Sequence, residues 1–137
     1  MKPGTLIASL AVLLILAGCA TTQVGSTRAC NDQVCHVTIS VGPGCDIKAD
    51  PETLEVKVKN TGVELHWDID TSGWAFNGTG IVVQRDDRQE FSGGHVAEQG
   101  RKYILHDKNS FTKQYKYEVH VKSGDQVCSL DPWVFNN

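Results

Sequence analysis

Polar and apolar residues alternate with a period of two along much of the chain, and this pattern constrains the fold more than any other feature. The alternating segments are residues 36–41, 54–58, 63–69, 81–83, 103–105 and 115–121. Such alternation predicts strands with one buried face and one solvated face. No segment shows a helical stripe. Six to eight short strands separated by turn residues predict an all-β fold, an antiparallel β-sandwich.

One pair of segments predicts a hairpin. Residues 54–58 and 63–69 flank the turn sequence Asn60-Thr61-Gly62, which is typical of a hairpin connection. Residues 86–97 are polar and contain glycines, so they predict a loop or at most a short helical turn. Residues 115–121 are expected to form an edge strand that offers a binding surface.

The N-terminus resembles a bacterial lipoprotein signal peptide. Lys2 precedes an apolar run over residues 6–16, which leads into Leu16-Ala17-Gly18-Cys19, a sequence of the lipobox form. The resemblance implies that residues 1–18 are a signal peptide and that Cys19 carries palmitate and further acyl chains. The alternative is a transmembrane anchor, but the run is far shorter than the roughly 20 residues that a spanning helix needs.

The residues that follow the lipobox bear on location and domain organisation. Ala20 and Thr21 replace the aspartate that resembles an inner-membrane retention signal, which implies the outer membrane, with the protein facing the periplasm. Residues 19–29 are mainly small and polar, which predicts a flexible lipidated tether. Residues 30–137 are then expected to form one domain, held to the membrane by its acyl chains.

Four cysteines remain once Cys19 is lipidated: Cys30, Cys35, Cys45 and Cys128. An even number of cysteines in an oxidising compartment predicts two disulfides, and four cysteines allow three pairings. The strand expected over residues 36–41 would separate Cys35 and Cys45 beyond the reach of a disulfide. This geometry favours Cys30 with Cys35 and Cys45 with Cys128.

The order of short motifs resembles cupredoxin-like β-sandwich domains. The motifs are Asp50-Pro51, Val63-Glu64-Leu65-His66-Trp67, Phe76 to Ile81, Tyr115-Lys116-Tyr117 and Asp131-Pro132-Trp133. They cover about residues 35–137 and are similar to small bacterial envelope proteins with a Tyr-x-Tyr strand and a DPxxxN tail. A blue-copper site needs two imidazoles, a thiolate and a weak axial group, usually methionine. Because Cys128 has no histidine after it and Met1 is the only methionine, we expect the fold without its copper site and no cofactor.

The histidines are His36, His66, His95, His106 and His120. No two have the short spacing of a ligand pair. His36, His66 and His120 share the outward parity of their strands, so two of them could lie side by side across a ladder. Solvated surface histidines remain the simpler interpretation, because a tight transition-metal site needs three or four converging ligands. His66 and His120 are kept as weak metal candidates.

The sequence contains no pattern that predicts catalysis or nucleic-acid binding. Asp68 and Asp70 share a strand face, but polar flanks predict a solvated face rather than a catalytic pair. Ser92 has no nucleophile-elbow pattern around it, and Gly78-Thr79-Gly80 is not followed by a helix that could bind phosphate. The net charge of −3 at pH 7 with scattered lysines is unlike the basic stripe of a nucleic-acid-binding protein.

The glycine-flanked segment from Gly73 to Gly78 is the most suggestive stretch for binding, because loops often carry function. Trp74, Phe76 and Asn77 are its candidate binding residues. The alternative is that an aromatic side chain there closes one end of the sandwich. Trp133 and Phe135 share one parity in the last strand and are expected in the core.

Together these features predict a non-enzymatic envelope lipoprotein with a binding or structural role, whose partner is an envelope protein or a cell-wall component. Two alternatives stay open. One is a periplasmic metal-handling protein that uses outward histidines, and the other is a small hydrolase or hydrolase inhibitor.

Overall fold

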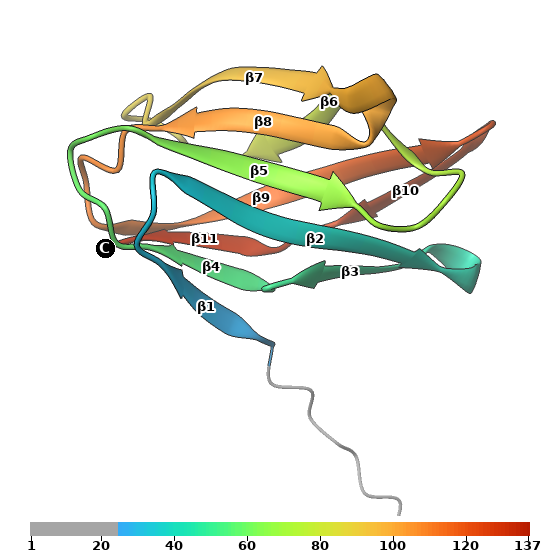
Figure 1. The fold of residues 1–137 in the computed structure, drawn as a ribbon, viewed down its shortest axis with the longest axis horizontal. Helices are drawn as coiled ribbons and strands as arrows, with labels where there is room; N and C mark the ends of the chain where they lie inside the picture. The colour runs from blue at the N-terminus through green and yellow to red at the C-terminus, as the bar shows by residue number, and fades with distance from the viewer. Residues whose placement is uncertain (1–24) are drawn as a thin grey trace, which may run out of the picture.

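The computed structural model describes residues 25–137, so the signal peptide, Cys19 and residues 20–24 of the tether lie outside the described residues. The described part forms two facing sheets joined by short connections (Figure 1). Its strands are β1 (Thr27–Cys30), β2 (Val34–Gly42), β3 (Asp46–Asp50), β4 (Thr53–Val56), β5 (Val63–Ile69), β6 (Ala75–Val83), β7 (Phe91–Ala97), β8 (Lys102–Asp107), β9 (Lys113–Ser123), β10 (Gln126–Leu130) and β11 (Trp133–Asn136). Two 3-10 turns, η1 (Pro43–Cys45) and η2 (Glu98–Gly100), complete the elements.

The two sheets confirm the all-β sandwich, but both are mixed rather than antiparallel. The first sheet, here called the β9 sheet, has the order β1-β4-β11-β9-β10, and β6 also pairs with β9. The second, here called the β5 sheet, has the order β3-β2-β5-β8-β7. Strands β1 and β11 both run parallel to β4, and β2 runs parallel to β5. The expectation of a purely antiparallel sandwich is therefore wrong at these three pairings.

The core lies between the sheets and follows the alternation seen in the sequence. Strand β5 alternates strictly between buried and half-buried residues, with Trp67 fully buried. The indole ring of Trp67 packs edge-on against the rings of Tyr117 and Tyr103, with centroid distances of 5.3 and 6.4 Å. Gly80 lies against Tyr103 at a φ of +43°, and any Cβ there would clash with that ring. The aromatic cluster thus excludes a side chain at residue 80.

Both expected disulfides are present in the structure. Cys30, at the end of β1, is bonded to Cys35 in β2, and Cys45 in η1 is bonded to Cys128 in β10. The first bond joins strands of the two sheets, and the second joins the turn between β2 and β3 to β10 of the β9 sheet; their Cα–Cα distances are 5.8 and 5.5 Å. Cys35 and Cys45 lie near opposite ends of β2, as the strand-length argument predicted.

The predicted hairpin of residues 54–58 and 63–69 is wrong. Strand β4 belongs to the β9 sheet and β5 to the β5 sheet, so the connection between them crosses the sandwich. Buried Asn109 binds this connection: its Nδ2 donates to the carbonyls of Val56 and Val58 at 3.1 and 3.0 Å. The backbone carbonyl of Asn109 accepts a hydrogen bond from the Asn60 N–H. Alternation predicted both strands, although β4 ends at Val56 rather than at residue 58, but it does not specify their partners.

Two expectations about loops also fail. Residues 91–97 form β7, although the whole of residues 86–97 was expected to be irregular. Among the strands of residues 25–137, β7 pairs only with β8. It has a register shift between Ser92 and His95 and is mostly exposed, so its sequence lacks the alternation that burial of one face produces. Residues 27–29, expected in the tether, belong to β1, which is held by parallel pairing with β4.

Strands β9 and β11 correct two further expectations. Strand β9 pairs with β6, β10 and β11, so residues 115–121 are central and not an edge strand. In β11 the buried residues are Val134 and Asn136, whereas Trp133 is exposed and Phe135 is half-buried. The Asn136 amide donates to buried Asp107 at 2.9 Å, which orients even-numbered residues inward. The expectation that Trp133 and Phe135 lie in the core is wrong.

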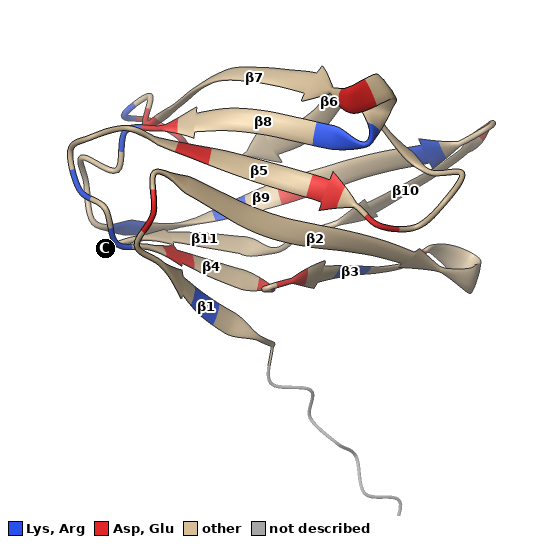
Figure 2. Ribbon diagram, in the orientation of Figure 1, with Lys and Arg blue, Asp and Glu red and all other residues tan. Residues whose placement is uncertain are grey.

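Charged residues of both signs are interspersed over the described strands and loops (Figure 2). Residues 25–137 include no helix long and apolar enough to cross a membrane.

Candidate functional site

Four histidines lie on the outer face of the β5 sheet: His36, His66, His95 and His106. Strand register places His36 of β2 opposite His66 of β5, and His66 opposite Ile104 of β8, which in turn lies opposite His95 of β7. The rings of His36 and His66 meet edge-on with their centroids 5.1 Å apart. The expected cross-strand neighbours are therefore present, and they occur because these two strands run parallel with both histidines outward.

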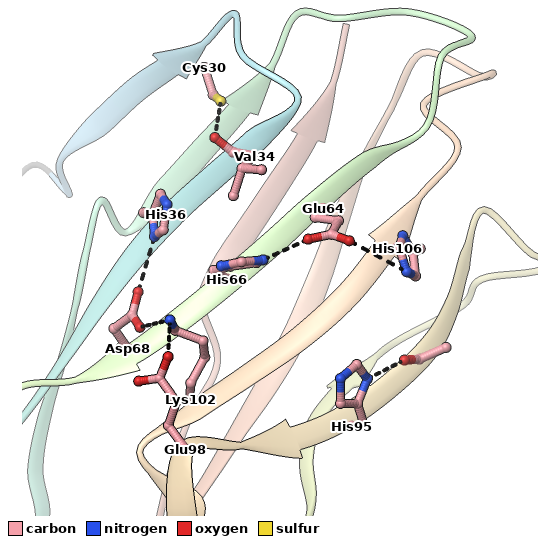
Figure 3. A network of polar contacts seen from close by, with 11 residues as sticks. Cys30, Val34, His36, Glu64, His66, Asp68, His95, Glu98, Lys102 and His106 are labelled. Carbon is pink, nitrogen blue, oxygen red and sulfur yellow. Dashed lines mark hydrogen bonds and ion pairs between the residues drawn. The ribbon is translucent and has the colours of Figure 1, made fainter.

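Glu64 lies between two of these imidazoles. Its Oε2 is 2.9 Å from His66 Nε2, and its Oε1 is 3.9 Å from His106 Nε2 on β8 (Figure 3). The hydrogen bond with His66 lowers the pKa of Glu64; burial opposes this shift, and the nearby charges of His106, His66 and His95 support it, so the pKa lies below its usual range. The register pairs Glu64 directly with His106, which explains this contact.

Asp68 forms a second set of contacts on the same face. Its Oδ2 lies 3.1 Å from His36 Nδ1, and its Oδ1 lies 3.4 Å from Lys102 Nζ. Lys102 also reaches Glu98 Oε1 at 2.6 Å (Figure 3). The hydrogen bond to Glu98 raises the pKa of Lys102; burial opposes this shift, and the charge of Asp68 supports it.

We call this surface the histidine face and define it by seven residues: His36, Glu64, His66, Asp68, His95, Lys102 and His106. Its side chains come from four strands; those of His36, His106, Glu64 and Asp68 are accessible to solvent, whereas those of His66 and Lys102 are mostly covered. Within residues 25–137, no three histidine, cysteine, aspartate or glutamate side chains are grouped so that they could hold a metal ion. The arrangement suits polar recognition by a macromolecular surface.

The structure separates the two weak metal candidates. His66 is on the β5 sheet, while His120 is on β9, beside Glu118 at 3.0 Å. They therefore do not form one site. Asp68 and Asp70 also have separate partners, because Asp70 accepts from Ser40 Oγ at 2.8 Å.

The candidate binding loop is mostly structural. Phe76 lies inside β6, is 3% exposed and packs edge-on against Tyr103 at 5.9 Å. Asn77 Oδ1 accepts hydrogen bonds from the backbone N–H groups of Thr79 and Gly80, which holds the irregular part of β6. Trp74 is partly buried and packs against the core. Phe76 is therefore a core residue, and its ring is not accessible to a partner.

A buried polar cluster that was not predicted from the sequence lies at the same end of the sandwich as the C-terminus. Asp107 is fully buried, and its Oδ1 accepts from the Asn109 N–H and from Asn136 Nδ2, each at 2.9 Å. Burial raises the pKa of Asp107 to about 6. Nearby, buried Glu90 accepts from the Ser110 N–H and hydroxyl. The asparagine of the DPxxxN tail, Asn136, was the available signal for this cluster.

No protein-family model matches the chain, and no curated protein matches it.

Proposed function

We propose that this chain is a non-enzymatic, lipid-anchored protein of the bacterial outer membrane that faces the periplasm and binds another envelope protein through the histidine face. The observation that carries the proposal is the convergence of seven polar side chains from β2, β5, β7 and β8 on one open sheet face. Catalytic groups usually lie in a concave pocket, which changes their reactivity. Polar groups on the outer face of a sheet are instead accessible to a partner.

The chemistry of the histidine face favours a partner with a mixed polar surface. Glu64 and Asp68 accept hydrogen bonds, Lys102 donates, and imidazoles can do either. The side chains of His36 and His106 are 57% and 52% exposed, so a partner can reach them without rearrangement of the core. Complementary charges of both signs give orientation and specificity more than raw affinity.

The proposed anchor limits where the partner can lie. If Cys19 carries the acyl chains, the eight residue steps from Cys19 to the start of β1 at Thr27 span at most about 28 Å when fully extended. Several acyl chains anchor a protein stably, because each buried methylene contributes about 0.8 kcal/mol. The partner would then be a membrane protein or a protein held near the membrane.

Size analysis of the detergent-solubilised envelope tests this proposal. The wild-type full chain should elute as a complex larger than its monomer, and a variant carrying His36→Gln and His106→Gln should shift toward the monomer. His120→Gln, on the other sheet, is the matched control and should elute like wild type. A wild-type chain that elutes as a monomer would refute the binding role, and an unchanged double variant would exclude the histidine face.

Metal handling remains the second candidate, because of the in-register pair His36 and His66. Two imidazoles alone predict weak binding of Cu(II), since tight sites use three or four ligands. Calorimetric titration of the full chain with Cu(II) should give weak binding that His36→Gln removes. Binding that is unaffected by this substitution would exclude the pair as the site.

A further inference from the structure

The outer face of the β9 sheet has a hollow of about 310 Å³, on the side of the sandwich opposite to the histidine face. Its lining residues come from the loop after β6, from β9 and from β11: Gln84, Arg85, Lys113, Gln114, Lys116 and Trp133. We call this the Trp133 hollow. Its volume is at the lower end of ligand pockets, which fits a small ligand or the end of a larger one.

Trp133 gives the hollow an aromatic wall. It is 36% exposed and lies in register with Lys116 of β9, because Val134 and Asn136 occupy the inward positions of β11. Ligand pockets are commonly lined by aromatic side chains together with a few polar groups. An indole presents a flat apolar face, and the amides of Gln84 and Gln114 beside it can bind hydroxyl groups.

The charged lining residues are all cationic. Arg85, Lys113 and Lys116 line the hollow, and none of its lining residues is acidic. Both lysines have carboxylate neighbours outside the lining: Lys113 Nζ is 2.9 Å from Asp87, and Lys116 Nζ is 3.1 Å from Asp131. Exposed ion pairs of this kind contribute little, about 0 to 1 kcal/mol, so an anionic ligand can exchange with them.

We propose that the Trp133 hollow binds an acidic saccharide. The apolar face of a sugar ring would stack on Trp133, its hydroxyl groups would bind Gln84 and Gln114, and its carboxylate or phosphate would pair with Arg85 and Lys116. A flat membrane surface fits less well, because it cannot follow a recess and would need the indole to project from the surface. The Trp133 hollow and the histidine face share no residue, so the saccharide site and the proposed function can fail independently.

The test uses the full chain in detergent and three probes of similar size. The first is a disaccharide of N-acetylglucosamine and N-acetylmuramic acid, which carries a carboxylate. The second is a glucosamine disaccharide that carries a phosphate, and the third is the neutral N-acetylglucosamine dimer. Calorimetric titration should detect binding of one or both acidic probes, with an affinity that falls as the salt concentration rises. The acidic probe that binds more tightly identifies the source of the anionic group.

Three variants locate the binding. Trp133→Ala should lower the affinity for the acidic probe by about tenfold or more, as expected on removal of an aromatic anchor. Arg85→Gln combined with Lys116→Gln should weaken it by a similar factor and remove most of the salt dependence. Phe111→Ala, at an exposed aromatic outside the hollow, is the matched control and should bind like wild type. Thermal unfolding of each variant checks that the fold is retained. If Trp133→Ala is unstable, the double variant still tests the site, because it changes only the ends of two accessible side chains.

Several outcomes would overturn the proposal. Equal binding of neutral and acidic probes would exclude recognition of the anionic group. No binding of any probe would exclude a saccharide site. Binding to vesicles of anionic phospholipid that Trp133→Ala removes, without saccharide binding, would assign the surface to the membrane. An equal loss of binding in Phe111→Ala would show that the effect is not local to the hollow.

Discussion

Asp107 is an ionisable side chain with no exposure to solvent, and its environment controls its protonation. It accepts two hydrogen bonds at Oδ1, while Oδ2 has no partner within residues 25–137. Burial raises its pKa from the ordinary 3.8 to about 6, against opposing effects of the Asn109 N–H and the Asn136 amide. The folded chain therefore holds a proton here at pH values where an unfolded chain does not.

We predict that stability contributed by Asp107 falls as pH rises. It is fully present below about pH 3.8 and is lost as pH rises through about 6, because the folded state binds more protons in that interval. The shift corresponds to at most about 3 kcal/mol. Asp107→Asn should flatten the dependence of the unfolding free energy on pH in this interval, measured by urea unfolding. Asp125→Asn, at an exposed aspartate, is the control, and an unchanged slope in Asp107→Asn would contradict the assignment.

At the scale of elements, the sequence predicts strands well and their neighbours poorly. Residues 36–41 and 63–69 are strands because one face of each is buried, and alternation encodes that burial. The crossing between β4 and β5 depends on Asn109, a distant residue whose role no local pattern indicates. The same limit applies to the histidine face: His36 and His66 could be predicted as neighbours from parity, but the contact of Glu64 with His106 requires the β5–β8 register.

Strand β6 gives a prediction that separates packing from binding. Phe76→Ala should cost about 3 to 5 kcal/mol of stability, because it removes a buried ring and leaves a cavity. Trp74→Ala should cost less, since this indole is only partly buried. Chemical denaturation of both variants measures the difference. A larger loss for Trp74→Ala than for Phe76→Ala would contradict the assignment of Phe76 to the core.

At the scale of the whole molecule, the disulfides limit the unfolded chain unequally. Cys45 and Cys128 are 83 residues apart in sequence, whereas Cys30 and Cys35 are five apart. Loop-closure entropy predicts a loss of about 4 to 5 kcal/mol for the double variant Cys45→Ser and Cys128→Ser, and about 2 kcal/mol for Cys30→Ser and Cys35→Ser. Denaturant unfolding tests the ranking, and a larger loss for the short loop would contradict it.

The lipid anchor is a prediction from the sequence, since Cys19 lies outside the described residues. We expect Cys19→Ser to abolish labelling by a palmitate analogue and to leave an unprocessed precursor, because the thiol is the proposed acylation site. Wild-type chain and a Cys30→Ser variant serve as controls and should both be labelled. Equal labelling of Cys19→Ser would refute the lipobox interpretation.

Site-specific photo-crosslinking in the native envelope is the sharpest test of whether the chain binds an envelope protein through the histidine face. A photoreactive residue replaces His95 on β7 in one full-length variant and Lys122 on β9 in another, both at exposed positions on opposite sheets. We predict a discrete protein adduct from position 95 that is absent from position 122. An adduct from position 122 alone, or the same adducts from both positions, would contradict the claim.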